Sequence, residues 1–251
     1  MKKMLRFDAI RTRADPSFFL FWLAFLAAFA LYAFTLHLGR LGGTGNAAMP
    51  LNVSYSAYAA KDAWVALCLL VSAMAARSVR SDISSRRIEV ILTQRVDRRE
   101  YYLGRSLFFV LTGVLVTLAL VAIAWSVGNV VFMGRYPVSS LDAEVGSGAA
   151  LGLLCSGAAL ASISLLPVVG AAVGLALLKA PAAAVYAVLA FLAWPLSVVA
   201  NALFGPAIMV DYAFAVLPRL GAGSAVVVLA VLAATALVYP VLWSLVMKRD
   251  I

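Results

Sequence analysis

Long apolar runs that contain almost no ionisable side chains constrain this sequence more than any other feature. Residues 17–38 and 182–204, for example, contain no Asp, Glu, Lys or Arg. A run of roughly 20 apolar residues is long enough to cross a bilayer as an α-helix, which satisfies its own backbone hydrogen bonds. Over the whole chain, 65% of the residues are hydrophobic and 12% are charged, a balance that soluble globular domains do not show. The sequence therefore predicts an all-α, polytopic membrane protein.

The apolar runs predict six transmembrane helices in a single transmembrane domain, residues 1–251. The predicted spans cover about residues 17–38, 57–76, 97–134, 149–178, 181–204 and 222–246. Residues 205–221 are apolar but too short to span, so they predict a short external or re-entrant helix. Few basic residues then lie outside: Arg40, Lys61, Arg135 and Arg219. Because basic loops stay inside, both termini are predicted to be cytoplasmic, and the chain is expected in the cell (cytoplasmic) membrane as a multi-pass protein.

Residues 77–105 form the one long polar insertion between the apolar runs. Eight of the twenty Lys and Arg residues lie here: Arg77, Arg80, Arg86, Arg87, Arg95, Arg98, Arg99 and Arg105. Ile88, Ile91 and Leu92 recur at helical spacing, which predicts a short amphipathic helix. Its other face carries Arg86, Glu89 and Thr93. The apolar stripe can meet either the lipid headgroups or a docked cytoplasmic partner, and the residues favour neither.

Polar residues mark where several of these helices begin. Residues 1–15 mix basic and apolar side chains, which predicts a basic helix at the membrane interface. Asp15 followed by Pro16 predicts the start of the first span, with the acid as N-cap and the proline in the first helical position. Asp97 with Glu100 three residues later predicts a capping box at the start of the third span.

Several functional classes lack the residues that they need. No Gly-x-x-x-x-Gly-Lys-Ser/Thr loop occurs, so the chain is expected not to hydrolyse ATP itself and not to be an enzyme alone. His37 is the only histidine and is expected to be a solvated interfacial residue, while Cys68 and Cys155 are expected to be packing residues rather than metal ligands. An ion-coupled transporter would be expected to carry ionisable residues inside its spans. The net charge of +9 reflects membrane orientation and does not indicate nucleic-acid binding.

The order of these segments resembles the permease subunits of type-2 ATP-binding-cassette exporters. Glu89-Val90-Ile91-Leu92, Asp97-Arg98-Arg99-Glu100 and Leu103-Gly104-Arg105 stand where that family commonly has an acidic residue with a leucine-rich helix, an arginine with a polar pair, and Leu-Gly-Lys. Arg95 stands at the usual proline position, and Arg87-Ile88 stand where Gly-Thr is common.

The resemblance implies a role for each polar segment. It implies that residues 1–14 are an elbow helix and that residues 84–96, within the cytoplasmic loop 77–105, are a coupling helix. The partners implied are a separate ATP-binding-cassette ATPase, which would hold ATP and Mg, and a second permease copy or paralogue. The residues implied at the ATPase contact are Arg87, Ile88, Glu89, Ile91, Leu92, Arg95, Asp97, Arg98, Arg99 and Glu100.

Two further expectations concern substrate and contact. The uncharged spans favour an apolar or amphiphilic substrate over a small free ion. Because buried apolar side chains stabilise interfaces more than exposed charges do, Ile88, Ile91 and Leu92 are expected to carry the contact to the ATPase, and the arginines to set orientation. The alternatives are a non-transporting membrane subunit that recruits a cytoplasmic partner, or an intramembrane enzyme, for which no nucleophile with an adjacent base is evident.

Overall fold

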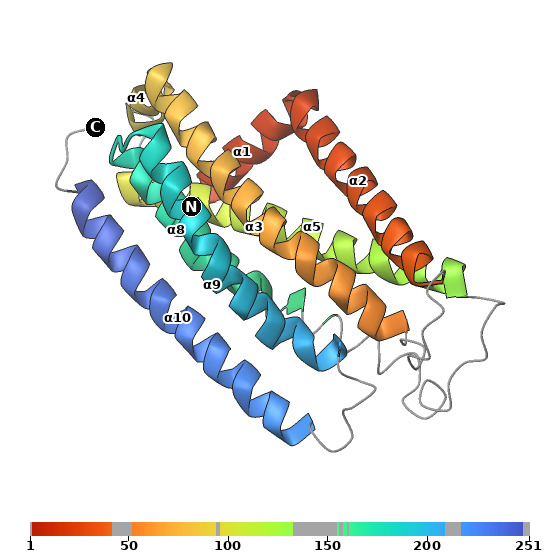
Figure 1. Cartoon of the computed structure of the whole chain (residues 1–251). Coiled ribbons are helices and arrows are strands. Elements are labelled where there is room, and N and C mark those ends of the chain that lie inside the picture. The colour runs from red at the N-terminus through yellow and green to blue at the C-terminus, as the bar shows by residue number, and fades with distance from the viewer. Residues whose placement is uncertain are drawn as a thin grey trace.

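The described part of the chain is a bundle of long helices. The computed structural model describes residues 2–41, 52–93, 96–132, 155, 158–159, 161–208 and 217–247, and no strand occurs among them (Figure 1). The helices are α1 (Lys2–Ala14), α2 (Pro16–Leu41), α3 (Asn52–Ser84), α4 (Arg87–Thr93), α5 (Arg98–Phe132), α8 (Leu165–Leu177), α9 (Ala182–Ile208) and α10 (Leu217–Met247). The all-α prediction is confirmed for these residues.

Five of the described helices are long and apolar enough to cross a membrane. Their spanning segments are Pro16–Thr35, Ala59–Ser84, Arg98–Gly128, Ala182–Ala200 and Leu229–Val246. The predicted fourth span, 149–178, lies partly outside the described residues, and its described part, Ala161–Leu177, is a shorter apolar helix. The chain is thus a multi-pass membrane protein by the length and composition of its helices.

Both ends of the predicted short helix at 205–221 belong to longer helices. Residues 205–208 are the last turn of α9, and residues 217–221 begin α10; residues 209–216 lie outside the described part. Pro218 occupies the first turn of α10, where a backbone N–H has no helical partner and proline is tolerated. Gly205-Pro206 therefore lies within α9 and Pro218 within α10, and the centre of the predicted short helix lies outside the described residues.

The break between α1 and α2 follows the predicted capping pattern. α2 begins at Pro16, and the Asp15 carboxylate accepts hydrogen bonds from the Ser17 backbone N–H at 3.0 Å and from its hydroxyl at 2.6 Å. These hydrogen bonds hold the pKa of Asp15 below its ordinary value. Asp15 lets the chain turn sharply, so that α1 and α2 form the V-shaped arm in Figure 1.

The polar insertion at 77–105 is mostly helical rather than a loop. α3 extends to Ser84 and α5 begins at Arg98, directly after the predicted N-cap Asp97. The predicted amphipathic helix, 84–96, is present in shorter form as α4. Its neighbours α3 and α5 therefore carry charged residues beyond their apolar segments, and α4 lies at their common end (Figure 1).

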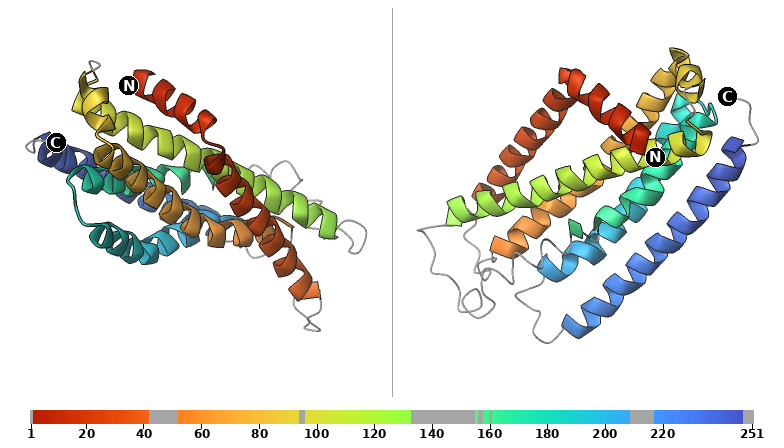
Figure 2. Two further views of the ribbon diagram at one scale, coloured as in Figure 1. Left: turned by 90° about the horizontal axis from the view of Figure 1, so that it is seen from above. Right: turned by 180° about the vertical axis from the view of Figure 1, so that it is seen from behind.

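The core is centred on α3, which packs against α5, α8 and α9. Trp64, Leu67, Val71, Ala75 and Val79 form a fully buried stripe at helical spacing along α3. In contrast, α2 and α10 lie at the edges of the bundle (Figures 1 and 2) and leave most of their apolar side chains exposed. Those exposed side chains are suited to contact with lipid.

Small residues bring α8 close to α10. A Cβ on Gly170 would lie 2.8 Å from two ring carbons of Tyr239 on α10, and a Cβ on Gly174 would lie 2.7 Å from Leu242 Cδ1. Cys68 is buried on α3, as expected for a packing residue, whereas Cys155 is exposed. The side chain of His37 lies outside the described part.

A lysine closes α8 in a conformation that usually requires glycine. Lys179 has φ 54°, and its N–H donates to the Ala176 carbonyl at 3.1 Å while the Ala180 N–H donates to the Leu175 carbonyl at 3.1 Å. These two bonds form a Schellman cap, whose left-handed residue is normally glycine. A side chain in this conformation costs roughly 1–2 kcal/mol.

We therefore expect Lys179→Gly to stabilise the protein by about 1 kcal/mol and to raise the thermal midpoint in detergent by about 2–4 °C. Lys179→Ala is the matched control, because it removes the same exposed amine but keeps the strained Cβ. An equal rise in both variants would assign the effect to the charge and contradict the conformational explanation.

Candidate functional site

The apolar stripe of α4 faces the protein's own helices. Ile88 and Ile91 are 3% and 6% exposed and belong to the same buried core as the membrane-spanning helices. A narrow crevice at this end is lined by Ile88, Leu92, Arg98, Tyr101, Leu177 and Val246. Ile88 and Ile91 are thus covered by the chain's own residues, without a partner or lipid headgroups, and their predicted contact to a separate protein stays a prediction. α4 packs against α3, and residues of α5, α8 and α10 line the crevice beside its stripe.

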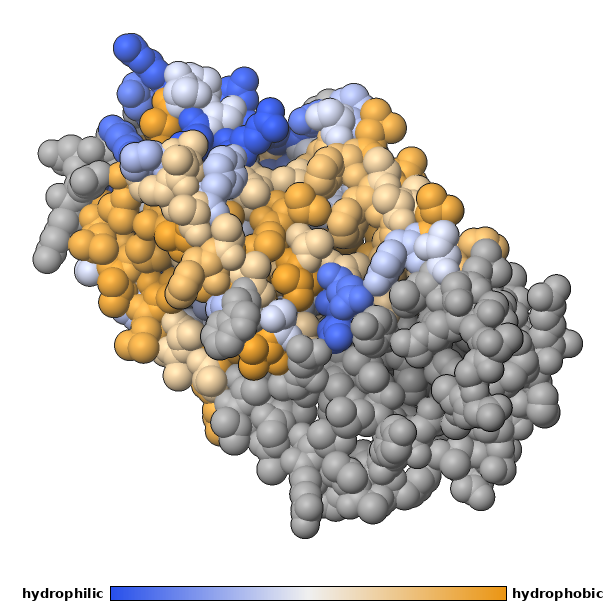
Figure 3. Space-filling view, in the orientation of Figure 1, coloured by the Kyte–Doolittle hydropathy of each residue, from blue (hydrophilic) through white to orange (hydrophobic). Residues whose placement is uncertain are grey.

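The face of α4 that remains exposed is mainly polar. Val90 is 58% exposed at its centre, and the other exposed residues on α4 and in the turn before it are Ser85, Arg86, Arg87, Glu89 and Thr93. Figure 3 shows hydrophilic residues gathered at this end of the molecule, above the apolar surface of the long helices. We call Arg86, Arg87, Glu89, Val90 and Thr93 the outer face of α4.

The remaining predicted contact residues surround the start of α5. Asp97 and Arg99 are exposed, whereas Arg98 and Glu100 are half-buried. Arg95 lies outside the described residues. The structure thus brings the exposed members of the predicted set to one surface, next to the outer face of α4.

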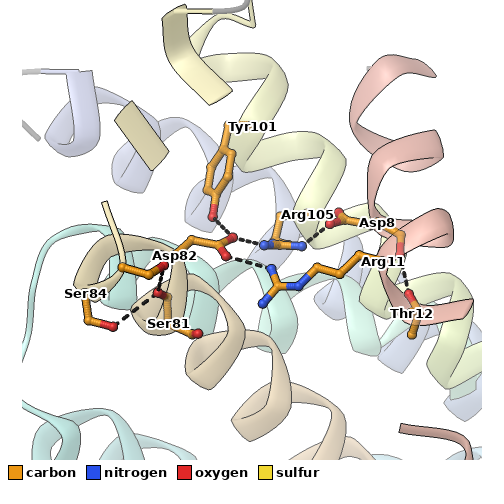
Figure 4. A network of polar contacts seen from close by, with 9 residues as sticks. Asp8, Arg11, Thr12, Ser81, Asp82, Ser84, Tyr101 and Arg105 are labelled. Atoms are coloured by element: carbon orange, nitrogen blue, oxygen red, sulfur yellow. Dashed lines mark hydrogen bonds and ion pairs between the residues drawn. The ribbon is translucent and has the colours of Figure 1, made fainter. Parts of the chain in front are cut away.

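Close to this surface lies a group of polar side chains from three helices, all buried except Arg11, which is 31% exposed. We call it the ion cluster: Asp8 and Arg11 of α1, Asp82 of α3, and Tyr101 and Arg105 of α5 (Figure 4). The side chains of Asp8, Asp82 and Arg105 are 1%, 0% and 2% exposed. Such burial of charge is costly unless each charge is paired.

Arg105 is the centre of the ion cluster. Its Nη1 donates to Asp8 Oδ1 and its Nη2 donates to Asp82 Oδ2, so a single guanidinium joins carboxylates of two different helices. Asp82 is paired on both oxygens: Oδ1 accepts from Arg11 Nη1 at 2.6 Å, and Oδ2 also accepts from the Tyr101 hydroxyl at 2.9 Å. The ion cluster therefore fastens α1 to both α3 and α5 (Figure 4).

The charges in the ion cluster balance, with two carboxylates and two guanidinium groups. Burial raises the pKa of the Asp8 carboxyl above its ordinary value, although the adjacent Arg105 acts in the opposite direction. Asp8 Oδ2 and Arg105 Nε have no hydrogen-bond partner among the described residues. The other carboxylate oxygens of Asp8 and Asp82 all accept hydrogen bonds from arginines. Loss of any one charge therefore leaves another charge buried and uncompensated.

Two further contacts fix the helix ends around the ion cluster. Arg80 Nη2 of α3 donates to the Ala180 carbonyl in the turn between α8 and α9. The Tyr102 hydroxyl donates to the Gly170 carbonyl of α8 at 3.2 Å, and its ring lies 5.4 Å from that of Tyr239 on α10. The two adjacent tyrosines of α5 thus have different hydrogen-bond partners: Tyr101 donates to the ion cluster, and Tyr102 donates to α8.

Sequence analysis missed the ion cluster because it assigned charged residues to loops and span ends. Asp8 follows the buried Met4 by one helical turn, and Asp82 follows the buried Val79 in the same way. An acidic residue that continues a buried apolar stripe within a basic segment is the signal that could have revealed it.

The described residues contain no group of three or more His, Cys, Asp or Glu side chains that could hold a metal ion. The arrangement is suited to transmitting movement. A short helix with one exposed face packs on the end of the helix bundle, and buried ion pairs hold the helices together at that end. Comparison of the chain with protein-family models, with curated proteins and with solved structures gives no match in any of the three.

Proposed function

We propose that this chain is the membrane subunit of an ATP-binding-cassette exporter, with α4 as its contact to a separate ATPase. The observation that supports this most is the placement of α4, a short helix between two long spanning helices, with one face seated on the bundle and the other exposed. In this proposal the α4 end lies in the cytoplasm, α1 is the elbow helix, and the full chain has six spans in the cell membrane. ATP and Mg are held by the ATPase, and a second permease copy or paralogue completes the transporter.

The proposed substrate is apolar or amphiphilic. Residues 16–35, 63–76, 106–128, 182–200 and 229–246 contain no Asp, Glu, Lys or Arg. A bare ion would find no compensating charge along these surfaces, whereas a lipid-like molecule or an apolar peptide needs none.

The structure changes which residues of α4 we assign to the contact. Since Ile88 and Ile91 are seated on the bundle, the outer face of α4 is the surface left for an ATPase. Val90 is its one large apolar side chain, and burying it would stabilise the complex by roughly 1.5–3 kcal/mol. The exposed arginines around it favour an acidic rim on the partner, each pair contributing about 0–1 kcal/mol.

We expect Val90→Asp to reduce co-purification of the ATPase from native membranes by about tenfold or more, because it places a charge where an apolar contact is needed. Val90→Ile keeps the apolar surface and is expected to bind normally. Ile91→Val, one residue along the helix but on the buried face, is also expected to bind normally.

Two results would count against the proposal. The first is repeated purification of the intact chain in mild detergent without any ATPase. The second is normal ATPase binding by Val90→Asp. Recovery with a cytoplasmic protein that has no nucleotide-binding site would favour a non-transporting subunit.

A further inference from the structure

We propose that Tyr101 and the ion cluster form a continuous connection through which α4 positions α1. Tyr101 is a positioning residue in this connection, because it lines a crevice together with residues of α4 and hydrogen-bonds to Asp82 of the ion cluster. The inference rests on the proposed function only for the identity of the partner that would move α4.

The first link joins α4 to Tyr101. The tyrosine is 1% exposed, and its side chain lines the same narrow crevice as Ile88 and Leu92, the inward-facing residues of α4. Close-packed interiors do not deform smoothly, so a shift of α4 toward or away from the bundle must displace this ring.

The second link joins Tyr101 to the charges. Its hydroxyl donates to Asp82 Oδ2 at 2.9 Å, and the Arg105 guanidinium carbon lies 5.5 Å from the centre of its ring. Asp82 Oδ2 accepts from Arg105 as well, so a displaced tyrosine disturbs the atom on which the ion cluster converges. Hydrogen bonds between charged partners are strong and directional, which lets them transmit such a displacement.

The third link joins the charges to α1. Arg105 donates to Asp8, and Arg11 of the same helix donates to Asp82 at 2.6 Å. α1 is thus held at two points one turn apart, and both points depend on the pair Asp82 and Arg105. Figure 4 shows these side chains spanning the space between α1 and the ends of α3 and α5.

The chain provides its own control for Tyr101. Tyr102 is the next residue on the same helix and is equally buried, at 1% exposed. Its hydroxyl donates to the Gly170 carbonyl and not to the ion cluster. Replacing either tyrosine with phenylalanine removes one buried hydroxyl, but only Tyr101→Phe interrupts the proposed connection.

The position of α1 can be measured without any partner protein. Met4 is the buried apolar residue of α1, at 1% exposed, so a cysteine at this position reacts with a maleimide only when α1 lifts from the bundle. The reporter is Met4→Cys in a background of Cys68→Ala and Cys155→Ser, assayed in native membranes. We expect Tyr101→Phe to increase the reaction rate about tenfold and Tyr102→Phe to change it less than twofold.

A double-variant cycle separates transmission from general loosening. Ile91→Val loosens the seat of α4 without removing an apolar contact altogether. We expect it to raise the reaction rate of the Met4→Cys reporter several-fold when Tyr101 is present and to add nothing in Tyr101→Phe, because the connection is already broken. The thermal midpoint of each variant is measured in parallel, and Tyr101→Phe and Tyr102→Phe are expected to lower it similarly.

The inference is overturned if Tyr101→Phe and Tyr102→Phe give the same reaction rate, or if Ile91→Val raises the rate equally with and without the Tyr101 hydroxyl. These outcomes do not depend on an ATPase. If no ATPase binds the outer face of α4 but the cycle is non-additive, the proposed function fails and the connection between α4 and α1 stands.

Discussion

Replacing Arg105 with glutamine should destabilise the protein by about 3–5 kcal/mol, the largest effect that we expect from a single substitution. Arg105 is 2% exposed and neutralises carboxylates of two helices. Without it, Asp8 and Asp82 are left with Arg11 alone, and one negative charge stays buried without compensation. The measurement is the midpoint of thermal denaturation in detergent, monitored as the loss of the monodisperse protein.

The control for Arg105→Gln is Arg99→Gln, which removes an exposed guanidinium from the same helix and should change stability by less than about 1 kcal/mol. A second test is the double variant Asp8→Asn with Arg105→Gln. It leaves Asp82 paired with Arg11, so the charges balance again, and we expect it to be more stable than Arg105→Gln alone. Additive losses in the double variant would show that the charges do not act together.

Gly170→Ala should destabilise the protein by about 1–3 kcal/mol, although alanine is the better helix former. The added Cβ would lie 2.8 Å from ring carbons of Tyr239 and 3.0 Å from its hydroxyl oxygen. The ring is rigid and its hydroxyl donates to the Leu166 carbonyl at 3.2 Å, so α10 must move away from α8. The same thermal midpoint measures the loss.

Gly174→Ala is the matched comparison, one turn further along α8. Its Cβ would lie 2.7 Å from Leu242 Cδ1, the end of a flexible side chain that can adopt another rotamer, and 3.1 Å from Leu242 Cβ, which must give by only a few tenths of an ångström. We expect a much smaller effect, partly offset by the better helix propensity of alanine. A loss as large as that of Gly170→Ala would contradict the assignment of the strain to the tyrosine ring.

The five spans found among the described helices could be predicted from the sequence because their signal is local. An apolar run long enough to cross a membrane has few alternatives to a helix, and the Asp15-Pro16 start of α2 is a capping pattern that neighbouring residues alone decide. The amphipathic pattern around Ile91 likewise predicted α4. The bounds of α3 were less secure, because the helix runs from Asn52 to Ser84 and so extends beyond both ends of the predicted span, 57–76.

What α4 packs against could not be predicted from the sequence. The apolar stripe of α4 indicates that an apolar surface covers it. Lipid, a partner protein and the chain's own helices could each supply that surface, and the pattern does not distinguish among them. Leu177 and Val246, which line the crevice beside Ile88, are distant in sequence. The ion cluster was missed for a related reason: pairing of Asp8 with Arg105 depends on how three helices cross, which no local pattern encodes.

The sequence separation within the ion cluster sets an order of events during synthesis. Asp8 and Arg105 are 97 positions apart, and Arg11 and Asp82 are 71 apart. At a synthesis rate of about 5–20 residues per second, Arg105 is synthesised roughly 5–20 s after Asp8. During that time the polar groups of α1 have only water and lipid headgroups to satisfy them. The exposed apolar side chains of Phe7 and Ile10 on α1 are suited to hold the helix at the membrane surface until α5 has inserted.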